Sequence, residues 1–181
     1  MRRLERGVAT LSRLAGALGA VATICCLLLV GYAVGMRYLL GQPEPWTDKV
    51  AGWLVVALVM LAAPEAQRRF EHIGVDIAVK RVGPRLARAA HLVGVLSVAA
   101  VAVMLLLAGW EMVAFSRMVG LMSDLEGVPI WWVQALMPLG AALLLLVSLC
   151  QAVLLLAGRD PVHLPRPEDD VLARDPLARA D

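Results

Sequence analysis

Four long stretches of this chain contain no Asp, Glu, Lys or Arg, and this pattern limits the possible folds more than any other feature. The stretches are residues 14–36, 50–64, 89–110 and 127–158. A helix needs about 20 apolar residues to cross ~30 Å of hydrocarbon, so all but the second can span a membrane unaided. The hydrophobic content of 60% and the mean hydropathy of +0.75 exceed those of soluble domains. The sequence therefore predicts an all-α membrane protein.

The second stretch is short, but it can be extended at both ends. Trp46 and Thr47 suit the membrane interface and the start of a helix, and the side chains of Arg68 and Arg69 can reach the headgroups from the other end. We therefore predict four transmembrane helices. Their approximate ranges are 14–36, 46–67, 89–110 and 129–157. A cleaved signal peptide is not expected, because the first stretch is longer than a typical signal-peptide core and no small-x-small site ends it.

The distribution of Lys and Arg outside these helices predicts the orientation. The first connection holds Arg37 and Lys49 and the third holds Arg117, whereas the N-terminal segment, the second connection and the tail hold four or more each. Because cytoplasmic segments carry the excess of basic residues, both termini are expected in the cytoplasm.

The domain plan follows directly from these helices. Residues 1–13 form a cytoplasmic N-terminal segment, residues 14–158 form the membrane domain, and residues 159–181 form a cytoplasmic tail whose prolines and acids are typical of disorder. The net charge is only +2, and the basic residues share their segments with most of the acids. No nucleic-acid partner is therefore predicted.

The predicted spans are poor in polar groups, which a pathway for ions or organic acids would need at membrane depth. The polar residues in the spans include Thr23, Tyr32, Ser97, Gln134, Ser148 and Gln151. Pro64 and Pro138 can kink their helices, but neither is accompanied by an ionisable residue at mid-depth. The chain is expected to be a scaffold rather than a pathway.

Residues for catalysis, cofactor binding or metal binding are not predicted. The sequence has no Gly-rich phosphate loop, no His pair at helical spacing, and no Ser or Cys nucleophile beside a base. Cys25, Cys26 and Cys150 are not at metal-ligand spacing, and we interpret them as small packing residues.

The segment between the second and third spans is densely charged. Arg68 and Arg69 are interpreted as anchors at the cytoplasmic surface, and Glu65 precedes Arg69 by one helical turn, so the two side chains can meet. The apolar residues from 73 to 83 alternate as in a strand, but some also fall on one helical face. Because a lone strand would leave its edges unpaired, we predict an amphipathic interfacial helix at about 73–83, with Asp76 toward water.

Two histidines leave an alternative function open. His72 and His91 could ligate a haem between neighbouring helices, which would make the chain a haem- or quinone-binding membrane anchor of a respiratory enzyme. Interfacial histidines more often satisfy a local hydrogen bond, so this interpretation is the secondary one.

Several short motifs resemble one family when they are taken in order. The motifs are Arg37-Tyr38, Pro45-Trp46-Thr47-Asp48, Arg69 and His72-Ile73-Gly74-Val75-Asp76. Together they resemble the small membrane subunit, DctQ type, of tripartite ATP-independent periplasmic (TRAP) transporters, over residues 30–88. Relatives commonly have two acids after the tryptophan, whereas Lys49 follows Asp48 here, so a role that needs two adjacent acids does not transfer.

The resemblance implies a non-catalytic scaffold subunit in a bacterial inner membrane. In this family a large membrane subunit carries the sodium and substrate sites, a periplasmic substrate-binding protein delivers an organic acid, and the small subunit braces the large one. A free-standing membrane adaptor is a further alternative.

The candidate residues for contact with partners come from these motifs and from the third connection. They are Arg37, Tyr38, Trp46, Asp48, Arg69, His72, Asp76, Met118 and Met122. A brief loop makes the first two spans antiparallel neighbours, so Arg37 and Asp48 either pair with each other or are each solvated at the headgroups. Met118 and Met122 either belong to a third helix that simply runs past the bilayer and packs on the fourth, or they form a docking surface.

Overall fold

The computed structural model describes residues 2–69, 84–123, 125 and 127–157. The helices within these ranges are α1 (Arg2–Leu39), α2 (Pro45–Arg68), α4 (Pro84–Val119), α5 (Trp131–Gln134) and α6 (Leu136–Leu156). Four helical segments are long and apolar enough to cross a membrane, with α5 and α6 forming one of them. The prediction of an all-helical chain with four such spans is confirmed for this part of the protein.

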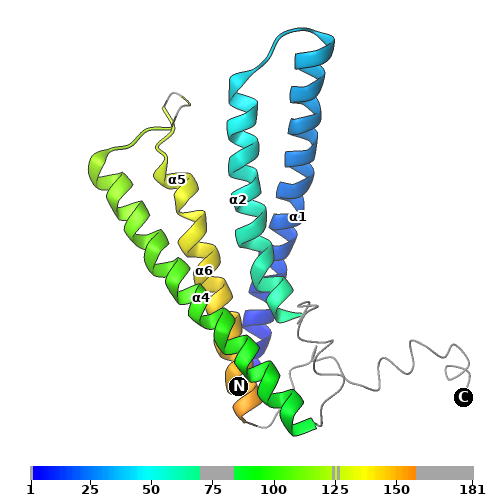
Figure 1. The fold of residues 1–181 in the computed structure, drawn as a ribbon, viewed down its shortest axis with the longest axis vertical. Coiled ribbons are helices and arrows are strands. Elements are labelled where there is room, and N and C mark those ends of the chain that lie inside the picture. The colour runs from blue at the N-terminus through cyan, green and yellow to red at the C-terminus, as the bar shows by residue number, and fades with distance from the viewer. Residues whose placement is uncertain (1, 70–83, 124, 126, 158–181) are drawn as a thin grey trace, which may run out of the picture.

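The helices form two antiparallel hairpins, α1 with α2 and α4 with α6 (Figure 1). We call the end with the connections 40–44 and 120–130 the loop end, and the end where α1 begins and α2 ends the basal end. Contacts between α2 and α6 join the two hairpins. The hairpins lie together toward the basal end and separate toward the loop end (Figure 1).

The observed helices extend beyond several of the predicted spans. Helix α1 contains the span expected at 14–36 but begins at Arg2, and α4 contains 89–110 but continues to Val119. The predictions placed the ends at charged residues, yet an α-helix satisfies its own backbone and need not stop where lipid gives way to water. The ends coincide instead with backbone signals, because Gly41 and Gly120 adopt φ of 65° and 68° just after α1 and α4.

Small residues on α1 allow it to pack closely against α2. A methyl group at Gly16 would lie 3.0 Å from Cβ of Glu65, and one at Gly19 would lie 3.3 Å from the Leu58 carbonyl oxygen. Ala15 and Ala22 are buried on the same helix. Small residues allow backbones to approach when lipid removes the hydrophobic drive between helices.

Glycine also determines where α6 crosses α2. Pro64 has no N–H to donate to the Met60 carbonyl within α2. A methyl group at Gly140 would lie 2.6 Å from that carbonyl oxygen and from Cβ of Met60. The backbone of α6 therefore meets α2 directly at this position.

The fourth predicted span is divided into two helices. Pro138 cannot donate a hydrogen bond to the carbonyl of Gln134, and α5 ends at that residue. Ala135 bridges the break, donating to the carbonyl of Trp131 at 2.9 Å and accepting from Leu139 at 3.2 Å. The span predicted at 129–157 is thus observed as α5 followed by α6.

Two of the predicted segments lie outside the described residues. These are the interfacial helix at about 73–83, with Asp76, and the tail at 159–181. His72 also falls in the first of these gaps.

Candidate functional site

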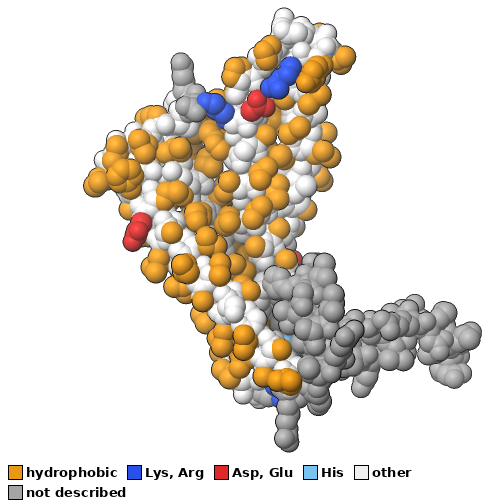
Figure 2. Space-filling view, in the orientation of Figure 1, with side chains coloured by type: hydrophobic (Ala, Val, Ile, Leu, Met, Phe, Trp, Pro, Cys, Tyr) orange, Lys and Arg blue, Asp and Glu red, His pale blue; other side chains and the backbone are white. Residues whose placement is uncertain are grey.

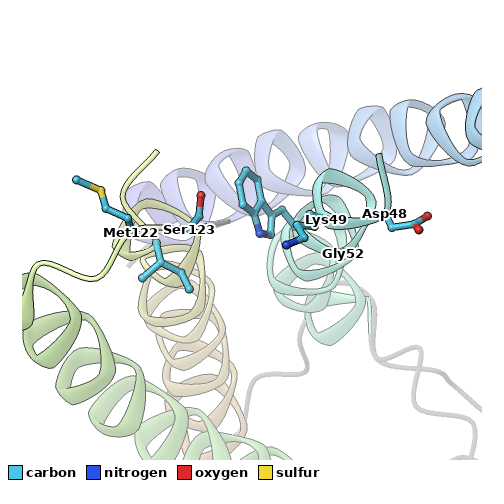
Figure 3. Close-up of a pocket in the computed structure, with 7 residues that line it drawn as sticks. Asp48, Lys49, Gly52, Met122 and Ser123 are labelled. Carbon is cyan, nitrogen blue, oxygen red and sulfur yellow. The ribbon is translucent and has the colours of Figure 1, made fainter. Parts of the chain in front are cut away.

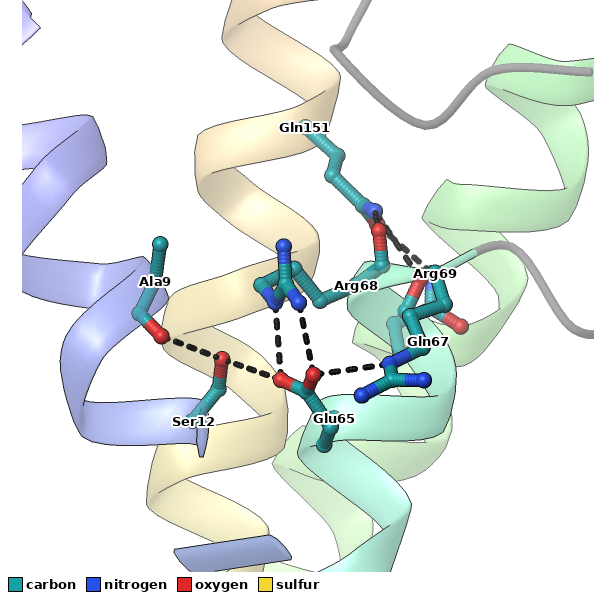
Figure 4. A network of polar contacts seen from close by, with 7 residues as sticks. All are labelled: Ala9, Ser12, Glu65, Gln67, Arg68, Arg69 and Gln151. Atoms are coloured by element: carbon teal, nitrogen blue, oxygen red, sulfur yellow. Dashed lines mark hydrogen bonds and ion pairs between the residues drawn. The ribbon is translucent and has the colours of Figure 1, made fainter. Parts of the chain in front are cut away.

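A buried carboxylate organises the basal end of α2. Glu65 is only 8% exposed. It accepts hydrogen bonds from Arg68 Nε at 2.7 Å and Nη2 at 2.6 Å, from Arg69 Nε at 2.8 Å, and from the hydroxyl of Ser12 on α1 at 2.8 Å (Figure 4). Bidentate, charge-assisted bonds of this kind are among the strongest in proteins. They offset the cost of removing the carboxylate from water.

Two glutamines extend this arrangement to α6. Gln67 Nε2 donates to Gln151 Oε1 at 2.9 Å, and Gln151 Nε2 donates to the main-chain carbonyls of Gln67 at 2.9 Å and Arg68 at 3.3 Å (Figure 4). The last carbonyls of a helix lack donors within the helix, and Gln151 supplies one to α2. Both glutamine side chains are buried.

We call this group the basal cluster, and it connects three helices. Its members are Ser12, Glu65, Gln67, Arg68, Arg69 and Gln151. Sequence spacing predicted the meeting of Glu65 and Arg69, and the 2.8 Å ion pair confirms it. The contributions of Ser12, Gln67 and Gln151 were missed, because they depend on which faces of the helices meet.

Of the two alternatives at the loop end, the pair is observed. Arg37 Nη2 lies 3.2 Å from Asp48 Oδ2, which joins the end of α1 to the first turn of α2. The two side chains are 52% and 67% exposed. An exposed pair contributes only about 0.2–1 kcal/mol to stability, so this pair can orient the ends of α1 and α2 but adds little to the free energy of folding.

The aromatic candidates at the loop end differ in their surroundings. Trp46 Nε1 donates to Glu44 Oε2 at 2.7 Å, and the Trp46 ring lies 6.5 Å from that of Tyr32 on α1. Tyr38 is exposed and extends from the last turn of α1. Trp46 thus helps to hold the hairpin, whereas Tyr38 is available for contact with another molecule.

A pocket of about 320 Å³ lies between the two hairpins at the loop end. It is lined by Asp48, Lys49, Gly52 and Trp53 of α2 and by Met122, Ser123 and Ile130 of the 120–130 connection (Figure 3). Asp48 and Met122, which the sequence suggested separately as partner contacts, therefore line the same pocket.

The two methionines beyond the third span are exposed. Met118 is 79% exposed and Met122 is 67% exposed. Helix α4 itself continues past Glu111 to Val119 and contacts α5 and α6, as the packing alternative expected, and these two side chains lie outside that contact. The connection is held instead by the main chain, with Ser123 donating to Val128 at 2.9 Å and Ile130 to Leu121 at 3.2 Å.

The remaining candidates do not converge on a chemical site. Arg69 lies in the basal cluster, His91 is buried on α4, and His72 and Asp76 lie outside the described residues. Across the ranges 2–69, 84–123 and 127–157, no three His, Cys, Asp or Glu residues are placed to hold a metal ion. The basal cluster and the Arg37–Asp48 pair connect helices, whereas Tyr38, Met118 and Met122 are exposed at the surface.

Comparison with known proteins identifies the family of the chain. The model of the DctQ component of tripartite ATP-independent periplasmic transporters matches residues 26–158. No curated protein matches the chain. The match includes the segment 30–88, where the sequence motifs suggested the resemblance, and continues through α4, α5 and α6. The chain therefore belongs to the DctQ family, whose members are components of tripartite ATP-independent periplasmic transporters.

Proposed function

We propose that this DctQ component is a non-catalytic subunit that braces the large membrane subunit of a TRAP-type secondary transporter. The large subunit would import an organic acid together with sodium, and a periplasmic binding protein would deliver the acid. The chain would be a multi-pass protein of the bacterial inner membrane, with both termini in the cytoplasm. Family membership supports the transport system, and the arrangement of polar groups supports the role within it.

The observation that carries this proposal is how the chain uses the buried polar groups of the basal cluster. Glu65 is the buried acidic residue of the described spans, and its oxygens bind Ser12, Arg68 and Arg69. Gln67 and Gln151 bind each other and the end of α2. A transport pathway needs polar groups that can exchange partners with a solute. In the basal cluster these groups are committed to holding helices together.

The outer surface of the helices agrees with a bracing role. Large apolar side chains are exposed along α1 and α4, and Figure 2 shows them over both hairpins. In a membrane, such a surface faces either lipid or another apolar protein. A subunit whose helices are hydrogen-bonded to one another and whose exterior is apolar can support a partner without forming a route itself.

Reconstitution of the transporter in proteoliposomes tests the proposal. We expect sodium-driven uptake of a labelled organic acid only when the large subunit, this chain and the binding protein are all present. We also expect the large subunit to co-purify with this chain. The large subunit with the binding protein, without this chain, is the matched control. Equal uptake in that control, or uptake by this chain and the binding protein alone, would contradict the proposal.

A further inference from the structure

The pocket between the two hairpins, which we call the loop-end pocket, has a polar end at the start of α2. Lys49 supplies an ammonium group there, directly before the charge-free stretch 50–64. Asp48 also borders the pocket, but it pairs with Arg37 at 3.2 Å, and Figure 3 shows its carboxylate directed away from Ser123. The polar end of the pocket therefore offers a cation to a ligand.

The loop-end pocket lies at the level of the membrane interface. Trp53 lines the pocket from α2, and Trp131 and Trp132 begin the fourth span, with ring centroids 5.9 Å apart. Arg117 stacks over the ring of Trp131 at 5.1 Å. Tryptophan and basic side chains of this kind concentrate at the headgroups of a bilayer. The pocket is therefore within reach of the phospholipid headgroups of the leaflet at the loop end.

From the pocket toward the basal end, one face of α2 is only partly covered by the second hairpin. Gly52, Val56 and Met60 follow one another at four-residue spacing and share this face, which we call the α2 strip. Met60 contacts α6, because a methyl group at Gly140 would lie 2.6 Å from its Cβ and from its carbonyl oxygen. Val56, one turn closer to the pocket, is nonetheless 39% exposed. Helix α6 thus meets the strip at Met60 and leaves Val56 open.

The length of the α2 strip corresponds to one leaflet of a bilayer. Lys49 and Met60 lie about 16 Å apart along the helix axis. Half of the ~30 Å hydrocarbon core is about 15 Å. At the basal end of the strip the backbones of α2 and α6 meet, at Met60 and Gly140. A transmembrane helix of another protein cannot continue through this crossing, whereas an acyl chain of one leaflet ends at that depth. The strip therefore fits a lipid better than a helix.

We propose that the loop-end pocket binds one phospholipid of the adjoining leaflet. Its phosphate lies against the Lys49 ammonium, and one acyl chain follows Gly52 and Val56 toward Met60. A bond between ammonium and phosphate is charge-assisted, and it is stronger where apolar groups exclude water. The acyl chain covers the apolar face that α6 leaves open, so the lipid fills the space between the hairpins. This inference requires only that the chain spans a membrane, and it does not depend on the bracing role.

Native mass spectrometry of the purified chain, delipidated and then titrated with phosphatidylglycerol, tests the contact with phosphate. One lipid should remain bound after the others have dissociated. Lys49→Gln should lower the fraction of protein that keeps this lipid about tenfold, because a charge-assisted bond is lost, and Lys49→Arg should keep it. The matched control is Arg13→Gln, which removes a charge from the exposed surface of α1 and should not change retention. Equal effects of Lys49→Gln and Arg13→Gln would overturn the proposal.

A pair of glycine variants tests the location of the lipid. Gly52 lines the pocket, Gly31 lies on α1, and nothing lies within 4 Å of a methyl group added at either position. Both helices can therefore accept a larger side chain. Gly52→Phe should occupy the pocket and lower retention of the lipid, whereas Gly31→Phe should not. Unchanged retention with Gly52→Phe would overturn the site. If Lys49→Gln does not accumulate, this pair of variants decides.

Two further measurements identify the occupant. Millimolar inorganic phosphate should not displace the lipid, because it lacks an acyl chain to cover the α2 strip. Displacement at that concentration would indicate a site for free anions and overturn the proposal. A benzoylphenylalanine at Val56, in membranes of the native cell, should form adducts with phospholipid on illumination. Crosslinks from Val56 to another protein, including a second copy of this chain, in place of lipid adducts would also overturn it.

Discussion

Glu65 and Asp48 show, at the scale of single residues, how burial changes the contribution of a carboxylate–arginine pair to the stability of the fold. Both carboxylates lie on α2 and bind arginine, with distances of 2.6 Å to Arg68 and 3.2 Å to Arg37. Glu65 is buried near the basal end, whereas Asp48 is exposed at the loop end. Removing one partner of a buried group leaves the others unpaired away from water, and an exposed group is simply rehydrated.

Matched carboxylate-to-amide substitutions should reveal this difference. We expect Glu65→Gln to destabilise the purified protein by about 1–3 kcal/mol, because Arg68, Arg69 and Ser12 lose a charged acceptor. Asp48→Asn should cost less than about 1 kcal/mol. Thermal unfolding in the same detergent measures both. Equal effects would show that the basal cluster does not stabilise the folded chain.

The residue scale also shows what the sequence could predict about the candidate sites. The contact of Glu65 with Arg69 was predicted and that of Arg37 with Asp48 was one of two alternatives, because one helical turn or a short loop brings each pair together. The bonds from Gln151 to α2 were not predicted, because Gln151 and Gln67 are distant in the sequence and meet only when α6 crosses α2.

At the scale of helices, close contact depends on the absence of side chains. The α2–α6 crossing places the backbone of Gly140 against Met60, and the α4–α6 contact places Gly109 where a methyl group would lie 2.9 Å from Cδ of Pro138. Such contacts replace the hydrophobic drive that lipid does not provide between helices. The contact of Gly140 with Met60 also joins the second hairpin to the first.

Replacing Gly140 by Ala should weaken the α2–α6 crossing. The added methyl group would lie 2.6 Å from the Met60 backbone, so the helices must move apart, at a cost of about 1–3 kcal/mol. Gly31→Ala on α1 is the matched control, since nothing lies within 4 Å of a methyl group there. Thermal unfolding compares the two variants. A Gly140→Ala protein as stable as the control would contradict a close crossing.

At the scale of the whole molecule, we predict the orientation from charge rather than from packing. Basic residues concentrate in the N-terminal segment, the second connection and the tail, which should therefore lie in the cytoplasm. Reporter fusions after Val79 and after Asp170 should report the cytoplasm. Fusions after Gln42 and after Asp124 should report the periplasm. Alkaline phosphatase and green fluorescent protein activities measure the two sides. A cytoplasmic signal after Asp124 would contradict the arrangement of four spans.

The sequence by itself determined the number and nature of the spanning helices and the family of the chain. Long uncharged stretches must form helices in lipid, since no other structure satisfies the backbone within one segment, and this requirement is local. The tertiary structure alone decided that α2 and α6 join the hairpins, that Glu65 is buried with Ser12, and that Met118 stays exposed. The charge-free stretches of the four spans are predominantly apolar around the helix, so hydropathy does not specify which faces meet. That choice depends on the fit of small residues and buried polar groups between helices distant in the sequence.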